Sequence, residues 1–291
     1  MNKFVTRTIS GAVYVLIVVG SIYSGKLLGG DSNTYQQIIG NFVFSVVLFV
    51  IGIIGIHEVI ANLRKKEVVV NAPLGYAVGV LTYLILALWL NGDNLFYTAD
   101  LTMLPALLPM LWLAVFLVQL WREDQHPFDT VGHTLLPSLW VMTPLALMTH
   151  IQNQSAGLMM MVFILIWVND SFAYMTGMLL GRHKMWERHS PNKTWEGTLG
   201  GIIFCIAAAM LVGPLFDTRA LNFDRSDWAV VALVCSIIGT LGDLVESMFK
   251  RYCGVKDSGK IMPGHGGVLD RFDSLLLSTP FIIAYIVICE L

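Results

Sequence analysis

The chain has 291 residues, of which 56% are hydrophobic and 13% charged, and its mean hydropathy is +0.69. Soluble proteins carry about 25% charged residues, so this composition excludes an ordinary soluble enzyme. The formal net charge of −2 says little about partners, because the charges are segregated by loop, and we expect no nucleic-acid partner. The four cysteines form no CxxC pair, which favours neither a zinc site nor a disulfide framework.

Apolar runs of roughly 20 residues recur along the chain, as expected where the bilayer is the solvent. They predict an all-α, polytopic membrane bundle of about nine transmembrane helices, the first retained and not cleaved as a signal peptide. The expected segments are 9–28, 36–61, 72–90, 101–121, 132–151, 156–178, 198–217, 228–246 and 273–290.

The basic residues of the connections predict the orientation, because Lys and Arg are enriched in cytoplasmic loops. With a cytoplasmic N-terminus, fifteen of the 18 Lys and Arg lie on that side. The opposite side receives Lys26, Arg219 and Arg225. We therefore predict a periplasmic C-terminus and two cytoplasmic polar loops, 179–197 and 247–272.

The polar residues divide the chain functionally into two regions. Residues 1–150 contain about five spans and little dense polar sequence, whereas residues 151–291 contain both polar loops. We expect the second region to be catalytic.

One face of the eighth segment is acidic near its end. Helical spacing of three and four residues places Asp243, Glu246, Ser247 and Lys250 together. Two neighbouring carboxylates need a cation. A bound metal and a salt bridge from Lys250 to Asp243 or Glu246 explain this face equally well.

The polar stretch that follows favours the metal. Asp270 and Asp273 stand three residues apart at the entry to the last segment, and carboxylates completed by water and phosphate are what Mg²⁺ prefers. Gly264, Gly266 and Gly267 permit a positive φ and a close approach of backbone N–H groups to an anion. The basic residues that would balance a polyphosphate are Lys250, Arg251, Lys256, Lys260 and Arg271.

A second cytoplasmic block begins inside the sixth segment. Asn169 and Asp170 are polar residues at membrane depth, which indicates a functional position. The stretch from Ser190 to Gly197 resembles a helix start that Thr194 would cap, with Lys193 beside a bound phosphate. An ordinary basic loop explains it equally well, and the order of a P-loop is absent.

Three histidine or glutamate positions stay open. His57 and Glu58 form a polar pair within the second segment, at a helix contact or lining a cavity. His265 is either a proton carrier or a residue that orders its loop.

Together these residues resemble the phosphatidate cytidylyltransferase (CDP-diacylglycerol synthase) family. The family's C-terminal pattern is met in full by Ser247-x2-Lys250-Arg251-x4-Lys256-Asp257-x5-Pro263-Gly264-His265-Gly266-Gly267-x2-Asp270-Arg271-x-Asp273. The Gly242-Asp243-x2-Glu246-Ser247 and Ser190–Gly197 elements also match family features, whereas the first 150 residues match only as generic spans.

The resemblance implies transfer of the cytidylyl group of CTP to phosphatidate, giving CDP-diacylglycerol and pyrophosphate. It implies Mg²⁺, with K⁺ as a second cation in some members, a homodimer, and location in the bacterial cytoplasmic (inner) membrane. By position, the implied metal ligands are Asp243, Asp270 and Asp273. The other implied catalytic residues are Lys250, Arg251 and Arg271. The implied substrate-binding residues are Asp170, Ser190, Lys193, Thr194, Glu196, Ser247, Lys256, His265, Gly266 and Gly267.

Two other classes of protein would use similar residues. A CTP-dependent lipid or prenol kinase would move the γ-phosphoryl group, and an ion-coupled transporter would use Glu58, Asp170 and Asp243 as relay sites. The transporter would predict inverted repeats, which the sequence does not display. A CDP-alcohol phosphotransferase is disfavoured because its D-G-x-x-A-R element is missing.

Overall fold

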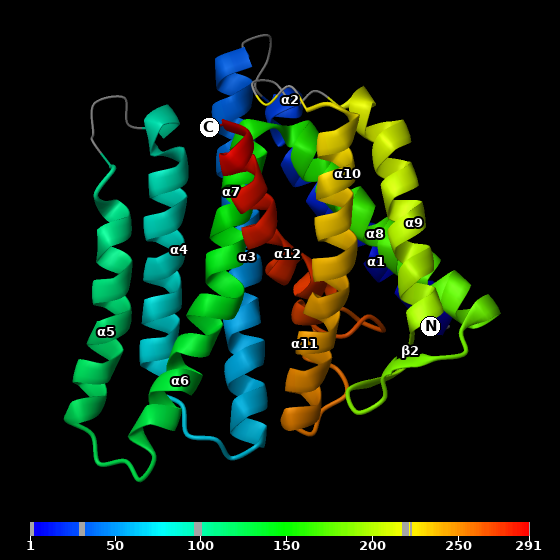
Figure 1. The fold of residues 1–291 in the computed structure, drawn as a ribbon. Helices are drawn as coiled ribbons and strands as arrows, with labels where there is room; N and C mark the ends of the chain where they lie inside the picture. Colours follow the sequence, from blue (N-terminus) through cyan, green and yellow to red (C-terminus); the bar gives the residue numbers. More distant parts are fainter. Residues whose placement is uncertain (1–2, 29–32, 96–100, 217–220, 222, 291) are drawn as a thin grey trace. The chain divides into compact units, whose positions relative to one another are not determined.

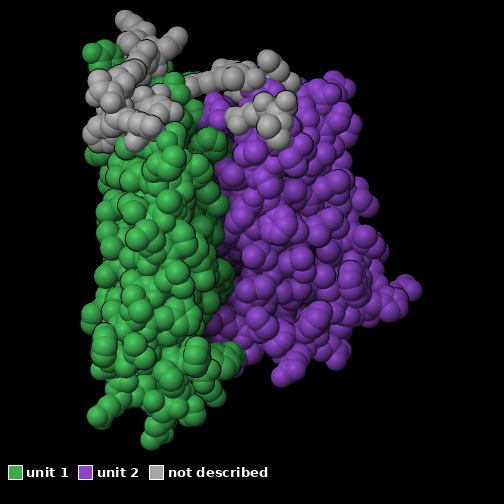
Figure 2. All heavy atoms as spheres, turned by 60° about the vertical axis from the view of Figure 1, so that its left-hand side comes forward, with its two compact units in different colours: residues 1–153, 252–270 green, residues 154–251, 271–291 purple. Residues whose placement is uncertain are grey.

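A computed structural model describes residues 3–28, 33–95, 101–216, 221 and 223–290 (Figure 1). The predicted position Arg219 lies outside this described part of the chain. Contacts divide the molecule into two compact units, which Figure 2 colours separately. Unit 1 comprises Met1–Asn153 and Tyr252–Asp270, and unit 2 comprises Gln154–Arg251 and Arg271–Leu291. The functional division at residue 150 stays a prediction.

Unit 1 is built mainly from helices. They are α1 (Lys3–Ile22), α2 (Ser24–Leu28), α3 (Asn33–Lys65), α4 (Ala72–Leu95), the 3₁₀ turn η1 (Leu104–Ala106), α5 (Leu107–Leu120), α6 (Pro127–Pro137), the π-turn η2 (Ser138–Met142) and α7 (Thr143–Gln154). Helix α4 contacts α3, α5 and α6. Buried side chains of the unit include Val78, Val115 and Val131, which form one apolar cluster.

Unit 2 contains the remaining helices and one hairpin. They are α8 (Ala156–Leu180), β1 (Lys184–Trp186), β2 (Ser190–Thr194), α9 (Trp195–Val212), η3 (Gly213–Leu215), α10 (Arg225–Leu233), the π-turn η5 (Val234–Ile238), α11 (Gly239–Tyr252) and α12 (Leu269–Glu290). The strands pair antiparallel, with Lys184 opposite Thr194 and Trp186 opposite Ser190.

Within the described residues, eight helical segments are long and apolar enough to cross a membrane. They are Val5–Ile22, Tyr35–Lys65, Ala72–Asn91, Pro127–Gln154, Ala156–Leu180, Trp195–Leu215, Arg225–Tyr252 and Leu269–Cys289. Each overlaps a predicted segment, which confirms a helical membrane protein. The remaining prediction, 101–121, coincides with a shorter apolar helix, Leu104–Leu120.

That shorter helix is at the lower limit for a span. At 1.5 Å per residue, 17 residues reach roughly 26 Å, against a hydrocarbon core of about 30 Å. The count of nine spans and the orientation therefore stay predictions.

Two of the long segments contain a π-turn. The fifth predicted segment was expected to bend at Pro137 and Pro144, and η2 lies between these prolines, where Thr143 Oγ1 donates to the carbonyl of Ser138 at 3.0 Å. The same carbonyl also accepts from the backbone N–H of Thr143, which closes the π-turn. The second π-turn, η5, was not predicted; Ser236 Oγ donates there to the carbonyl of Ala232 at 2.7 Å.

Helices α11 and α12 approach closely at a glycine. A Cβ atom on Gly242 would lie 2.5 Å from the carbonyl oxygen of Asp273 and 3.1 Å from Cα of Ser274. Both are backbone atoms of α12, so a larger residue at 242 would have to separate the two helices.

Gly242→Ala is expected to destabilise the protein by about 1–3 kcal/mol, the usual cost of overpacking. Thermal unfolding in detergent measures the change. Gly132→Ala is the matched control, because a Cβ there meets nothing within 4 Å. Alanine is also the better helix former, so the control should keep or raise the melting temperature. Equal melting temperatures for the two variants would contradict the close approach.

Candidate active site

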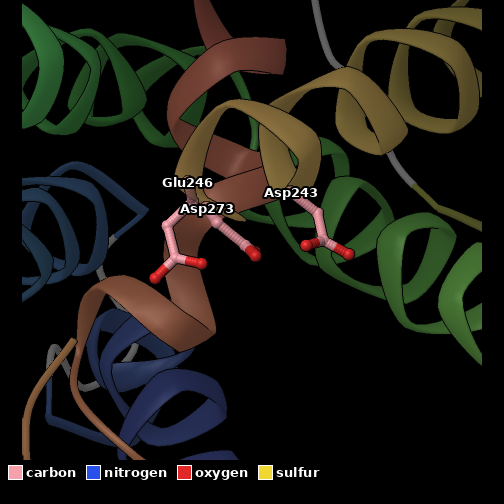
Figure 3. A group of neighbouring side chains, drawn as sticks. All are labelled: Asp243, Glu246 and Asp273. Atoms are coloured by element: carbon pink, nitrogen blue, oxygen red, sulfur yellow. The ribbon is translucent and has the colours of Figure 1, made fainter. Parts of the chain in front are cut away.

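Three carboxylates meet where α11 and α12 approach each other. Asp243 and Glu246 lie on α11 and Asp273 on α12, and one oxygen from each lies within 4.8 Å of the others. Figure 3 shows the three side chains gathered on one side of the two helices. We call Asp243, Glu246 and Asp273 the acidic cluster.

Two lysines balance part of this charge. Lys193 Nζ lies 2.8 Å from Asp243 Oδ2, and Lys250 forms an ion pair with Glu246. The salt-bridge interpretation of α11 is thus correct for Glu246, whose side chain is completely buried. The cluster thus combines three carboxylates with two ammonium groups.

The cluster is continuous with polar residues of α8 and β2. Asn169 Nδ2 donates to Thr240 Oγ1 at 3.4 Å, and Lys193 Nζ donates to the carbonyl oxygen of Thr240 at 3.2 Å. Asn169 Nδ2 also lies 3.4 Å from Oδ1 of Asp170, whose side chain is exposed. Asp170 therefore adjoins the same network, and its functional role stays a prediction.

The hairpin holds Lys193 beside α11. Thr194 caps α9, as predicted: its side chain accepts a hydrogen bond from Gly197 N at 3.1 Å. Glu196 accepts from the backbone N–H groups of Arg182 and His183 at 3.1 and 3.2 Å, which fixes the turn after α8. Thr194 and Glu196 thus order the backbone that carries Lys193.

The remaining predicted basic residues are exposed. Arg251 Nε donates to the carbonyl of His189 at 3.4 Å, which ties the end of α11 to the residue before Ser190. Lys256 and Arg271 are also exposed. Ser247 Oγ donates to Asp243 Oδ1 at 3.3 Å, on the acidic face of α11.

Asp270 has a different environment, which belongs to unit 1. Its Oδ2 accepts hydrogen bonds from Ser258 N at 2.9 Å and Gly267 N at 2.7 Å. It also lies 2.8 Å from Ser258 Oγ, whose single hydrogen is shared between Asp270 and Glu58. Asp270 therefore organises the loop 253–268, and its assignment as a metal ligand stays a prediction.

Glu246 is the carboxylate that the predicted ligand set omitted, although its three-residue spacing from Asp243 placed it on the same face.

The glycines of this loop have two different roles. Gly264 and Gly266 adopt φ of 80° and 85°, as expected, whereas Gly267 is outside the left-handed region. A Cβ on Gly266 would also lie 2.5 Å from Asp270 Oδ2. The N–H of Gly267 donates to Asp270, so this N–H serves an internal anion.

His265 contacts α1. Its Nδ1 lies 2.7 Å from Ser10 Oγ, and Ser10 Oγ also donates to the carbonyl of Pro263 at 3.0 Å. The backbone N–H of His265 donates to Met262 O at 2.9 Å. These contacts favour the loop-ordering interpretation of His265.

The sequence is similar to known proteins along almost its whole length. The sequence profile described as the Cytidylyltransferase family matches residues 5–289, which include every element of the acidic cluster. Proteins called phosphatidate cytidylyltransferase are similar in sequence. That of Staphylococcus aureus (strain COL) is 46% identical over 135 residues, or 45% of this chain and 50% of the relative.

Two further relatives with this name give similar values. The Staphylococcus saprophyticus protein is 44% identical over 135 residues, covering 45% of this chain and 50% of the relative. The Staphylococcus haemolyticus protein is 48% identical over 122 residues, covering 41% and 45%. The chain thus spans about half the length of the curated relatives it matches. The match over residues 5–289 establishes that the chain belongs to the cytidylyltransferase family.

Proposed function

We propose that this protein transfers the cytidylyl group of CTP to phosphatidate, giving CDP-diacylglycerol and pyrophosphate for phospholipid biosynthesis. The observation that carries this proposal is the family match over residues 5–289, which includes the acidic cluster. The relatives' name, phosphatidate cytidylyltransferase, supports the choice of substrates.

The reaction depends mainly on positioning the two substrates and on neutralising their negative charges. A phosphate oxygen of phosphatidate attacks the α-phosphorus of CTP, and the bond from that phosphorus to the pyrophosphate oxygen breaks. Phosphate monoesters are ionised near neutral pH, so the nucleophile needs no general base. The protein has to bring two anions together, and cations at the site make this possible.

The acidic cluster fits Mg²⁺. Its carboxylate oxygens are hard ligands, and one oxygen from each residue converges within 4.8 Å of the others. We propose Asp243, Glu246 and Asp273 as protein ligands, with Asp270 retained from the sequence prediction. A bound Mg²⁺ would offset the charge of the triphosphate. K⁺ remains a candidate second cation.

The surrounding residues divide between the two substrates. Lys193 and Lys250 already lie at the carboxylates, where each ammonium group can also face a phosphate. We assign contacts with triphosphate or lipid phosphate to Lys250, Arg251, Lys256 and Arg271. We assign the nucleotide to Ser190, Lys193, Thr194 and Glu196. Ser247, Asp170, His265, Gly266 and Gly267 complete the proposed substrate site.

We also propose a homodimer in the bacterial cytoplasmic (inner) membrane, with the active site facing the cytoplasm. The eight membrane-length segments support the membrane location, and the loop charges support the orientation. CTP is water-soluble and phosphatidate is a lipid, so their site has to lie at the membrane surface.

An assay with α-³²P-labelled CTP, phosphatidate and Mg²⁺ tests the proposed reaction. Label is expected in the lipid product, because the transferred group contains the α-phosphorus. γ-Labelled CTP is the matched control and should label only pyrophosphate. Lipid labelled from γ-labelled CTP alone would identify a kinase, and CTP-independent uptake into proteoliposomes would identify a transporter.

Asp273→Asn should lower activity by at least about a hundredfold, since charge-stabilising groups are commonly worth that much. Glu246→Gln should raise the Mg²⁺ concentration needed for half-maximal activity. Mg²⁺ should also raise the melting temperature of the wild type more than that of Asp273→Asn, because a ligand stabilises the state that binds it.

Asp129→Asn is the matched control for these carboxylate variants, since Asp129 is exposed in the first turn of α6. It should behave as the wild type. Full activity of folded Asp273→Asn would refute its assignment as a metal ligand.

Labelling with a membrane-impermeant amine reagent tests the orientation. Lys26 should react from the periplasmic side of intact spheroplasts, because it lies in a predicted outer connection. Lys256 is exposed in the structure and should react only after the membrane is opened. The reverse pattern would invert the topology.

A further inference from the structure

Glu58 of α3 is a buried carboxylate to which the proposed reaction gives no role. Glu58 is only 4% exposed to solvent. It accepts hydrogen bonds from Ser258 Oγ at 3.0 Å, Val268 N at 2.9 Å and Leu269 N at 3.0 Å. A buried carboxylate costs several kcal/mol unless donors surround it, and these donors all come from the loop 253–268 and the first residue of α12. Glu58 therefore holds both ends of one segment.

Two glycines make room for this carboxylate. A Cβ on Gly259 would lie 2.2 Å from Glu58 Oε1, and one on Gly267 would lie 2.4 Å from the same atom. Neither glycine is in the left-handed region, so backbone conformation does not require them. The close contact with Glu58 requires glycine at both positions, so the loop backbone fits closely around this carboxylate.

Ser258 is the point at which the loop is fixed. Its hydroxyl donates to Glu58, its N–H donates to Asp270 at 2.9 Å, and its carbonyl accepts from Asn62 Nδ2 at 2.7 Å. Asn62 lies one helical turn after Glu58 on α3. Ser258 is only 3% exposed, whereas Lys256 and Lys260, two residues to either side, are exposed. The buried serine thus fixes the middle of a short segment whose two exposed lysines carry ammonium groups.

We propose that Glu58 is a positioning residue, which acts through Ser258 to hold Lys256 and Lys260 where they bind a substrate phosphate. The phosphate-binding role rests on the proposed function, and it includes Lys260, which the sequence analysis already placed among the basic residues suited to a polyphosphate. A flexible loop would have to be ordered each time a phosphate binds, and a loop already fixed by Glu58 avoids that entropic cost.

Glu58→Gln removes the charge with little change in volume. The amide group would present N–H donors to the N–H groups of Val268 or Leu269, where the carboxylate presents acceptors. Ser258→Ala is a milder second variant, which keeps the carboxylate and deletes one hydroxyl. His57→Gln is the matched control, because the adjacent His57 is exposed and its Nδ1 lies 2.9 Å from Tyr76 Oη.

The experiment combines hydrogen exchange with steady-state kinetics on the full-length proteins in lipid nanodiscs. Glu58→Gln should speed exchange in the segment 258–269 by about tenfold, since each lost bond to a charged acceptor is worth at least that factor. The hairpin 184–194 should exchange as in the wild type. KM for CTP or phosphatidate should rise by about tenfold, with a smaller fall in kcat. Ser258→Ala should show the same changes at smaller size, and His57→Gln should show none.

Unchanged exchange in both Glu58→Gln and Ser258→Ala would overturn the proposal. Faster exchange with wild-type KM values would also overturn it, because Glu58 would then order the loop without serving the substrate. The exchange measurement needs no turnover. A wild type that fails to transfer α-label to lipid would therefore refute the proposed function, while exchange still decides whether Glu58 fixes the loop.

Discussion

The close approach of α11 and α12 at Gly242 is the constraint on which the candidate site depends. Carboxylates repel each other, and apolar surroundings raise the cost of bringing them together. The missing side chain at 242 lets backbone meet backbone, so that Asp243, Glu246 and Asp273 converge although they come from two helices. Lys193 and Lys250 offset part of the repulsion between these carboxylates. The result is a group of oxygen ligands close enough together to hold a metal ion.

Four of the buried or half-buried acidic residues described above have two different kinds of partner. Glu58 and Asp270 are surrounded by N–H and O–H donors of the loop 253–268, and their oxygens hold that backbone in place. Asp243 and Glu246 are instead paired with the ammonium groups of Lys193 and Lys250. The first kind fixes the backbone of the loop, and the second kind is the one that we propose as metal ligands. Composition alone cannot distinguish them, because the difference lies in the partners.

Local sequence patterns predicted the structural features that depend on residues close together in the chain. Apolar runs gave the membrane-length helices, spacing placed Asp243 and Glu246 on one face, and Thr194 caps α9 as expected. Contacts between distant residues could not be predicted in this way. Glu58 and Ser258 are 200 positions apart, and no periodicity links them. The ion pair of Lys250 with Glu246 follows the local i, i+4 spacing of α11, whereas no local pattern links Lys193 of the hairpin to Asp243.

The π-turn at Val234–Ile238 affects how the span that carries the site can change in length. A π-turn holds one residue more than an α-turn, so deleting a residue within it leaves a regular helix with both flanking faces in place. Deletion elsewhere between Arg225 and Tyr252 would rotate one half against the other by about 100° and turn the acidic face away from α12. The span therefore has one place where its length can vary without loss of its orientation. Evolution could have inserted a residue there while Asp243 and Glu246 kept their direction.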